Sequence, residues 1–598
     1  MKYHWILVVF FTGLTTLHIY SQPVILGGSG SPKIKVTTSD QWTQNHWQDS
    51  ASGQKVIDGS GLIFDEMVAS RFLYQAGFGA NQFLIKQVAS QGIEVWLEQQ
   101  QNLPVSSLTD ILVNIHKDVS DWHFKNGGDS TNLALQPNFV HFNYAWWTMN
   151  HTKPDVLRQR IAFALSELFV VSQNSNFEGM GLAGSTYYDL LLKNSFGNFR
   201  DLLTDVTLSV SMGSYLSNLN NPKSIPDENI NPDENYAREI MQLFTIGLFE
   251  LNLDGSYKLD SAGNKIPTYN QRDVQELAKV FTGLGLSAVV PNEWIDTASF
   301  GINVYFADLT KPMRMYENWH EPGIKTILNE HIIPSGQAGM KDISDALDIL
   351  FNHSNVGPFI SKQLIQRLIK SNPSPDYIER IARVFNNDGN GIRGNLKAVV
   401  KAILLDDEAR TCDWLLDDEN GQLREPILRY AHFLNAMQDE HYYNRYWNQM
   451  YDFYQNTGQM PLAAPTVFNF FTPNYSPNGE LKKANLVAPE FQIHNSKTSI
   501  GYINLVNNWT IYDTPFYSWE RNDPSAYLNI DELKKVARDP EVLVNQLDML
   551  FTHGNMSDRT RGIIKQTIQE LINGDFRNER VRLAIYLTLI SPDYAIFK

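Results

Sequence analysis

Amphipathic helical periodicity runs from Phe64 almost to the C-terminus and constrains the fold more than any other feature of the chain. In the first of these helices Val68, Phe72 and Leu73 fall on one face. A long pattern with few helix-breaking residues follows Pro154 and ends at Phe169. Further helices are expected at 187–192, 198–203, 341–352, 356–370, 376–386, 394–405, 424–439, 484–507, 531–551, 557–573 and 576–590. These patterns predict a mainly α fold, a large multi-helix globular structure.

Small β-hairpins are the expected insertions in this helical fold. Between 251 and 268, Asp254-Gly255 and Gly263-Asn264 separate short alternating runs, which is typical of a hairpin. Residues 286–318 lack a helical stripe and are predicted to form loops with another short hairpin. We expect residues 63–598 to form a single large helical domain, and a division into two lobes near 330–340 is left open.

The N-terminus has the pattern of a secretory signal peptide. One positive charge, on Lys2, precedes an apolar stretch from Trp5 to Leu17, and the small residue Ser21 follows. This stretch is shorter than the roughly 20 residues that a membrane span needs. We expect residues 1–21 to be a cleaved signal peptide and 22–62 a flexible leader. The mature chain should be exported, periplasmic or extracellular, and without a membrane span.

Composition excludes some classes of protein and partner. Hydrophobic residues make up 43% of the 598 positions and charged residues 19%, a globular balance. Lys and Arg number 49 against 65 Asp and Glu, a net charge of −16, so we expect no nucleic-acid partner, because binding phosphates needs clustered cations. Cys412 is the only cysteine, which excludes an intrachain disulfide and favours an inert thiol.

A polar helix face within the segment from Asn231 to Gly247 is the first candidate site. Four residues at positions i, i+3, i+4 and i+7 share this face: Asn235, Arg238, Glu239 and Gln242. Asp233 fits an N-cap, and Gly247 lies where the helix would stop. In one interpretation the face is a satisfied internal network that clamps helices together. In the other, Glu239 is a general acid or base, and the other three residues bind substrate.

The turn at His320 is the second candidate site. His320 and Glu321 could act as catalytic groups, and Lys325 could bind substrate. The spacing is not that of an HExxH motif and no second histidine lies at helical ligand distance, so we predict no metal site. A histidine in such a loop is also typical of a structural hydrogen bond. Arg160, on the long helix, is a further substrate-binding candidate, because it could pair with Glu239 or its neighbours.

Several motifs of known chemistry are absent from the sequence. It has no GxSxG, no GxxxxGK[ST] and no GxGxxG after a strand. The segment from Asn386 to Gly391 resembles a calcium loop, but Lys397 stands where a bidentate glutamate belongs, so a turn between helices is favoured. No cofactor can be named from these patterns.

An aromatic and amide-rich region covers residues 441–480. Its first half holds Tyr442, Tyr443, Tyr446, Trp447, Tyr451, Phe453 and Tyr454. A second group of aromatic residues lies between Pro465 and Tyr475. Aromatic rings beside Asn and Gln suit stacking against sugar rings. Ordinary packing of loops over the core is the alternative interpretation.

Several segments, taken in order, resemble a bacterial family of exported proteins without an assigned activity, the domain-of-unknown-function family numbered 1800. They are Ala69–Ala80, Leu157–Phe169, Phe196–Leu203, Asn235–Gly247, Val280–Leu284, His320–Leu328, Gly394–Val400 with Asp406–Arg410, and Pro465–Phe470. The resemblance spans about 64–598. Two residues depart from it: Glu321 stands where the family often has Asp, and Gln242 where it often has Glu.

The resemblance implies export and a helical fold but no reaction. It also implies gene neighbourhood with a second exported family, numbered 1501, that is similar to alkaline phosphatases and sulfatases. The favoured hypothesis is a binding or assembly protein whose partner is this phosphatase-like protein or a surface glycan. The alternative is an exported hydrolase of polysaccharide or another surface polymer that uses the helix face and the His320 turn.

Overall fold

The computed structural model describes residues 56–57, 62–128, 137–175, 179–328, 331–410, 420–437, 440–441, 450–514, 516–517 and 524–598. The fold is mainly α with small antiparallel sheets, as predicted. The proposed signal peptide, nearly all of the leader and Cys412 lie outside the described residues. Of the helices in the described part of the chain, none is long and apolar enough to cross a membrane.

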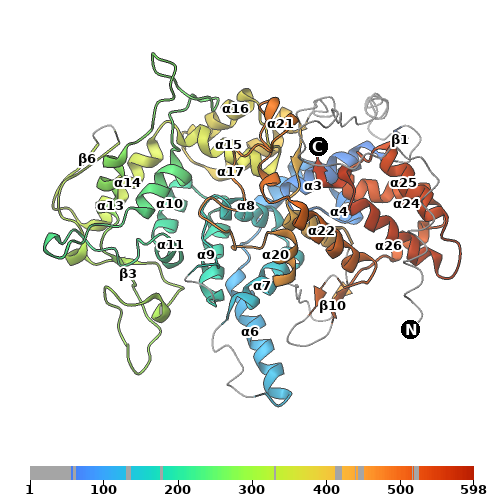
Figure 1. Ribbon diagram of the computed structural model, residues 1–598, viewed down its shortest axis with the longest axis horizontal. Helices are drawn as coiled ribbons and strands as arrows, with labels where there is room; N and C mark the ends of the chain where they lie inside the picture. Colours follow the sequence, from blue (N-terminus) through green and yellow to red (C-terminus); the bar gives the residue numbers. More distant parts are fainter. Residues whose placement is uncertain are drawn as a thin grey trace.

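The helices form one elongated body with the N- and C-terminal helices at the same end (Figure 1). The main helices are α3 (Phe64–Ala76), α4 (Gln82–Gln91), α5 (Ile93–Gln101), α6 (Leu108–Lys125), α7 (Phe139–Thr152), α8 (Val156–Ser166), α9 (Gly181–Asn194), α10 (Phe199–Thr207), α11 (Val210–Tyr215), α12 (Asn235–Glu239), α13 (Gln271–Val280), α14 (Gly339–Asn352), α15 (Val356–Leu368), α16 (Pro375–Asn386), α17 (Leu396–Leu405), α19 (Pro426–Met437), α20 (Met450–Thr457), α22 (Ser496–Thr510), α23 (Asp531–Val536), α24 (Pro540–Leu547), α25 (Asp558–Gln569) and α26 (Phe576–Leu589).

Helix α8 lies in the middle of the body and is surrounded by other helices (Figure 1). Every residue from Leu157 to Ser166 is buried, which is typical of a helix at the centre of a large core. The hydrophobic core is continuous from Met67 to Phe597. Residues on both sides of 330–340 contribute to this core, and the division of the domain there stays a prediction.

The C-terminus contacts both a strand from later in the chain and the first long helix. Strand β11 (Ile596–Phe597) pairs antiparallel with β7 (Gln422–Leu423). Arg71 of α3 donates a hydrogen bond from Nε to the carbonyl oxygen of Lys598 over 3.0 Å. The N-terminal helices therefore pack beside the C-terminal ones in a single body.

Capping residues and prolines determine where several helices begin. The hydrophobic periodicity of the sequence predicts these boundaries less accurately. The segment predicted as a helix at 484–507 becomes α22 only from Ser496, because the side chain of Asn495 caps it in a capping box with Thr498. The stretch 531–551 is divided into α23, α24 and a π-helical segment that begins at Asp548, and Pro540 is the first residue of α24. The segment from Asn386 to Gly391 forms the expected turn between α16 and α17.

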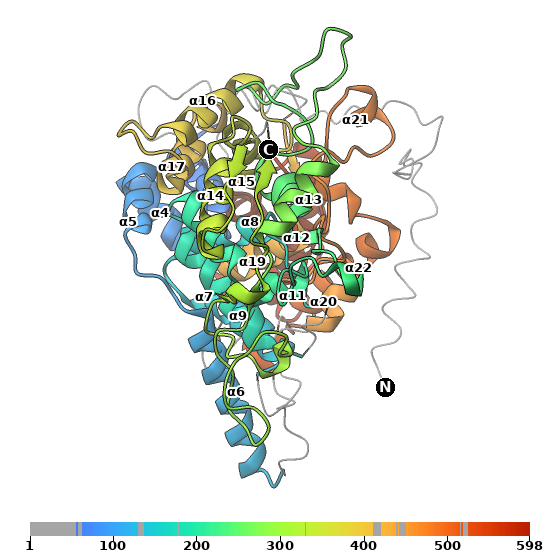
Figure 2. The same cartoon turned by 90° about the vertical axis from the view of Figure 1, so that its left-hand side faces the viewer.

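Short hairpins interrupt the helices near the candidate sites. Strand β3 (Leu284–Gly285) pairs with β4 (Arg314–Met315), and β5 (Lys325–Ile327) pairs with β6 (His331–Ile333). The hairpin predicted at 251–268 is confirmed by antiparallel bridges, of which one joins Leu251 to Tyr257. This hairpin projects beyond the helices, as Figure 2 shows.

Candidate functional site

The predicted polar helix face begins as an α-helix and changes to a π-helix. Helix α12 ends at Glu239, and a π-helical segment follows from Ile240 to Thr245. The predicted N-cap, Asp233, is one residue off: the N-cap of α12 is Glu234, whose side chain makes no capping hydrogen bond. The Asp233 carboxylate accepts a hydrogen bond from the backbone N–H of Asn235 over 2.8 Å, just before the helix. Gly247 ends the segment at a φ of 71°, a left-handed conformation that favours glycine.

The four residues of this face have different surroundings. Asn235 is exposed. Arg238 donates to the Glu234 carboxylate over 2.8 Å, and both side chains are partly open to solvent. Gln242 accepts a hydrogen bond from the hydroxyl of Tyr269 over 3.4 Å. These contacts make the first turns of the face a solvated surface with an ion pair.

Glu239 differs from its neighbours because one carboxylate oxygen, Oε2, is buried without a hydrogen-bond partner among the described residues. Burial raises the pKa of this carboxyl, and the neighbouring Arg238 lowers it by a smaller amount. Glu239 also raises the pKa of Tyr215 and Tyr269, so it lies near both rings. The side chain is thus a half-buried acid whose pKa lies above its ordinary value.

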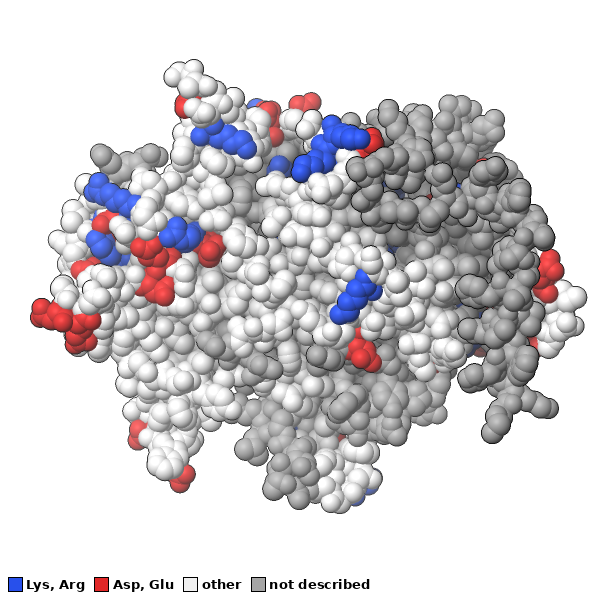
Figure 3. All heavy atoms as spheres, viewed as in Figure 1, with Lys and Arg blue, Asp and Glu red and all other residues white. Residues whose placement is uncertain are grey.

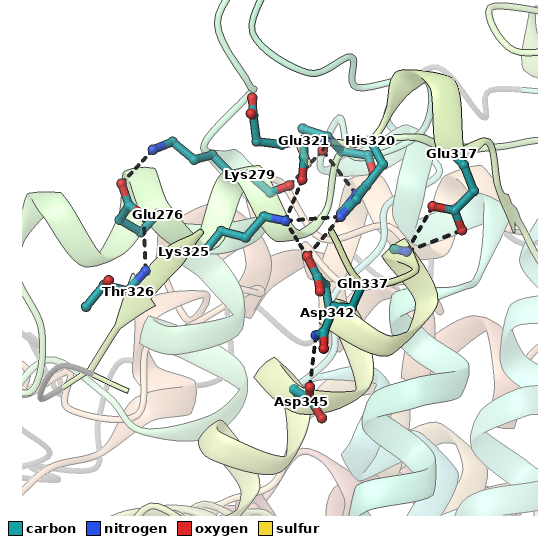
Figure 4. A network of polar contacts seen from close by, with 12 residues as sticks. Glu276, Lys279, Glu317, His320, Glu321, Lys325, Thr326, Gln337, Asp342 and Asp345 are labelled. Atoms are coloured by element: carbon teal, nitrogen blue, oxygen red, sulfur yellow. Dashed lines mark hydrogen bonds and ion pairs between the residues drawn. The ribbon is translucent and has the colours of Figure 1, made fainter. Parts of the chain in front are cut away.

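His320, Lys325 and a residue that the sequence analysis missed, Asp342, meet in the interior (Figure 4). Their side chains are 3%, 1% and 1% exposed. His320 Nε2 lies 3.0 Å from Asp342 Oδ2 and 3.2 Å from Lys325 Nζ. The Lys325 ammonium also donates to Asp342 Oδ2 and to the carbonyl oxygen of Glu321. We call these three side chains the buried triad.

Surrounding groups fix the buried triad in place. Because a carbonyl oxygen only accepts, His320 Nδ1 donates to the Thr282 carbonyl over 3.0 Å. The Thr282 hydroxyl accepts from the backbone of Glu321 over 2.9 Å. The Glu321 carboxylate accepts from the backbone of Ser224 over 3.3 Å. The triad therefore connects β5, α14 and the loop after α13, which favours the structural interpretation of His320.

The two predicted sites are separate in the described structure. Helix α13 packs against both α12, which carries part of the polar face, and β5, which carries Lys325. Within the described ranges, no hydrogen bond or ion pair joins Glu239 to His320, Glu321 or Lys325. No group of three His, Cys, Asp or Glu side chains placed to hold a metal ion is found among the described residues.

Arg160 lies in a second interior polar group. Its side chain is 2% exposed, and Nη2 donates to the carbonyl oxygen of Arg367. Burial lowers its pKa, and Glu425 is the strongest of the nearby charges that oppose this shift. A substrate could reach Arg160 only after surrounding helices had moved.

An open pocket of about 290 Å³ brings together segments that are far apart in the sequence. It lies between α15, the chain from Gln242 to Tyr257, and residues 468–474. We call it the α15 pocket. Its described lining residues are Gln242, Leu243, Gly247, Leu248, Phe249, Leu251, Gly255, Tyr257, Phe359, Lys362, Gln363, Gln366, Phe468, Thr472, Pro473 and Asn474.

One face of α15 forms the floor of this pocket. Phe359, Lys362, Gln363 and Gln366 are spaced i, i+3, i+4 and i+7 and all line it. The opposite wall is clamped by Asn355, which directly precedes α15 and is fully buried. Asn355 Nδ2 donates to the carbonyl oxygens of Ile246 and Phe249 over 2.8 Å each. These bonds hold the chain after the π-helix at a fixed distance from α15.

The aromatic region of the sequence contributes in part to the pocket. Phe468 lines it and is 45% exposed, whereas Phe453 is buried in the core. Tyr442, Tyr443, Tyr446 and Trp447 lie outside the described residues, and the side chain of Tyr451 is not described. The pocket thus contains Gln242 and part of the 465–475 segment, which sequence reasoning named, together with Phe359, Lys362 and Gln363, which it did not name. The mixed aromatic, cationic and amide face of α15 is the signal that could have identified them.

Comparison with known proteins gives one match. A family model described as "Protein of unknown function (DUF1800)" matches residues 71–596. No curated protein and no solved structure matches the chain.

Proposed function

The chain belongs to the DUF1800 family of proteins of unknown function, and on that premise we propose that it is an exported protein that binds a surface glycan in the α15 pocket. The binding is non-catalytic, and the ligand contacts come from α15, Gln242 and residues 468–474. A phosphatase-like exported protein is the other proposed partner.

The lining of the α15 pocket is the observation that carries this proposal. Phe249, Phe359 and Phe468 supply aromatic surface to it. Gln242, Gln363 and Asn474 supply amide groups, which can both donate and accept hydrogen bonds. A sugar ring presents apolar C–H faces and a rim of hydroxyls, so a site with both kinds of side chain suits it. Leu248 and Phe468 are exposed, which leaves the pocket open to a polymer chain.

The buried triad supports a binding protein over a hydrolase. A catalytic residue must touch the substrate, and the triad is almost completely withdrawn from solvent. The Lys325 ammonium and His320 are held by Asp342 Oδ2 and by neighbouring backbone carbonyls, which is the arrangement expected of a clamp between structural elements, although Asp342 Oδ1 has no hydrogen-bond partner among the described residues.

Truncation of Phe468 tests the glycan site directly. Titration calorimetry of the full chain with dextran, polygalacturonate and dextran sulfate measures Kd for a neutral, a carboxylated and a sulfated polysaccharide. Phe468→Ala should weaken binding of the bound polymer about tenfold, since an aromatic contact of this size contributes roughly 1.5 kcal/mol. Phe83→Ala is the matched control, because Phe83 is exposed and does not line the pocket. Equal affinity of both variants and the native chain, or no binding of any polymer, would refute the proposal.

A hydrolase is the second candidate function, and the surroundings of Glu239 support it. Its raised pKa and its buried free oxygen suit a general acid, and it precedes the pocket residue Gln242 by one helical turn. In this candidate the same polysaccharides are cleaved, and reducing ends accumulate with the native chain. Glu239→Gln should abolish that release while leaving the Kd unchanged. If neither protein releases reducing ends, the non-catalytic form of the proposal stands.

A further inference from the structure

The α15 pocket has a positive charge without a compensating negative one. Lys362 lines it, and no aspartate or glutamate is found among the described lining residues. This is unusual for a chain with a net charge of −16. In Figure 3 the charged side chains gather at the left and along the upper rim of the visible face, and its middle is nearly free of them.

Lys362 has no ion pair or hydrogen bond with any residue in the described part of the chain. Its side chain is half-buried, and burial lowers the pKa of the ammonium below its usual value. Lys265 lowers this pKa further, so a second cation is close to the first. Lysines that are withdrawn from water and have no opposite charge are costly, which favours a ligand that supplies the charge.

Two acidic side chains of the hairpin, Glu250 and Asp254, are already engaged elsewhere. The Glu250 carboxylate pairs with Lys258 over 3.1 Å and with His353 over 3.6 Å. Asp254 accepts hydrogen bonds from the backbone and hydroxyl of Ser256 over 2.9 and 2.6 Å. Neither residue lines the pocket, so neither neutralises Lys362.

Lys265 adds to the positive charge at the hairpin side of the pocket. Its Nζ lies 3.7 Å from the ring centroid of Tyr257 and 5.3 Å from that of Phe249, and both rings line the pocket. The ammonium is held over these rings by the cation–π interaction. Lys362 and several aromatic rings thus line the pocket, and Lys265 packs against two of these rings without lining the pocket itself.

From this placement we infer that the ligand is an anionic glycan, whose carboxylate or sulfate group binds Lys362 while a sugar ring packs against Phe468. Lys265 faces the same anionic chain at the hairpin side. This inference rests on the proposed glycan site and adds the charge of its ligand. A carboxylate and a sulfate offer the same chemistry to a lysine, and the choice of polymer separates them.

Titration calorimetry with matched polymers tests the inference. Polygalacturonate carries carboxylates, dextran sulfate carries sulfates, and dextran is the neutral reference. The native chain should bind one or both anionic polymers at least about tenfold more tightly than dextran. Lys362→Met should reduce this preference to nearly none, whereas Lys362→Arg should retain it. Lys535→Met removes the same charge from an exposed ion pair outside the pocket and should change nothing.

Different results would contradict the anionic preference and the proposed glycan binding. If dextran binds as tightly as the anionic polymers and Phe468→Ala weakens it, the glycan site stands and its preference for anions is wrong. If the anionic preference survives in Lys362→Met but disappears at high salt, it comes from the general surface and the inference is overturned. If no polymer binds, both proposals fail. Circular dichroism and thermal unfolding of each variant confirm that the fold is retained.

Discussion

Lys325 is buried and Lys362 is half-buried, and the two ammonium groups differ in their contacts. Lys325, in the buried triad, contacts the Asp342 carboxylate, His320 and a backbone carbonyl. Lys362, in the α15 pocket, has none of these contacts and lies beside aromatic and amide side chains. The protein itself supplies the hydrogen-bond acceptors and the opposite charge for Lys325. Lys362 has no such partner among the described residues, so a ligand could supply it.

This difference teaches which polar groups of a large helical protein bind ligands. A buried charge with partners from several elements stabilises the positions of those elements, and its removal damages the fold. A half-buried charge without partners in an open pocket costs stability and is more often found at functional sites. The polar motif most visible in the sequence, around His320, belongs to the first kind. The lysine on α15, which no motif marks, belongs to the second.

The largest expected effect is the loss of the triad. Asp342→Ala leaves the Lys325 ammonium buried without its carboxylate, so we expect the free energy of unfolding to fall by about 3–5 kcal/mol. Urea denaturation followed by circular dichroism measures this change as a shift of the midpoint. The matched control is Asp121→Ala, which breaks the exposed pair with Lys117 and should cost no more than about 1 kcal/mol.

A double variant tests whether the loss of stability comes from the unpaired charge of Lys325. Asp342→Leu combined with Lys325→Met removes both charges and should cost less than Asp342→Ala alone, because no charge is left uncompensated. If Asp342→Ala lowers the free energy of unfolding by less than about 1 kcal/mol, the triad is not a structural clamp. The contrast between the two lysines would then be lost.

The sequence predicted the helical architecture well because periodicity reports directly on which face of a helix is buried. It predicted boundaries less well, since capping by Asn495 and the start of α24 at Pro540 are local events within a continuous apolar pattern. The π-helix from Ile240 to Thr245 was not foreseen, because an α-helix and a π-helix of this length have nearly the same residue pattern.

The sequence predicted only some of the residues in the candidate sites, because their partners lie far away along the chain. His320 and Lys325 are near each other in the sequence, but their carboxylate partner, Asp342, lies on a helix that follows the β5–β6 hairpin. Asp342 falls on the buried face of α14, together with Ala346 and Leu350. An acidic residue on an apolar stripe is a signal that a partner is needed, but the sequence does not say which one. The α15 pocket likewise depends on three distant segments that only the fold brings together.

The second prediction concerns the pH dependence of glycan binding. Only the protonated form of Lys362 attracts an anion, and the pKa of this group is lowered by burial and by Lys265. Affinity for the anionic polymer should therefore be constant up to this lowered pKa and decrease above it, at a lower pH than for an ordinary lysine near 10.5. Calorimetry at pH 7, 8, 9 and 10 measures the decline, which should reach about tenfold as the charge is lost.

Lys362→Arg is the variant that isolates this effect. Arginine stays protonated over the whole range, so its affinity should remain nearly constant from pH 7 to 10. The other groups near the pocket, including Lys265 and Tyr257, are the same in both proteins and contribute equally. A parallel decline in the native chain and in Lys362→Arg would show that another group controls binding and that Lys362 does not contact the anion.

The smallest expected effect gives the most direct contrast between the two lysines. Lys362→Met replaces an unpartnered, half-buried ammonium with an apolar side chain of similar length, so the free energy of unfolding should stay the same or rise by less than about 1 kcal/mol. Lys325→Met should instead lower it by several kcal/mol, because the Asp342 carboxylate is left buried and unpaired. Urea denaturation of the two variants in parallel, without polysaccharide, measures both. If Lys362→Met destabilised the fold as strongly as Lys325→Met, Lys362 would be part of the scaffold, and the charge of the α15 pocket would need no ligand to account for it.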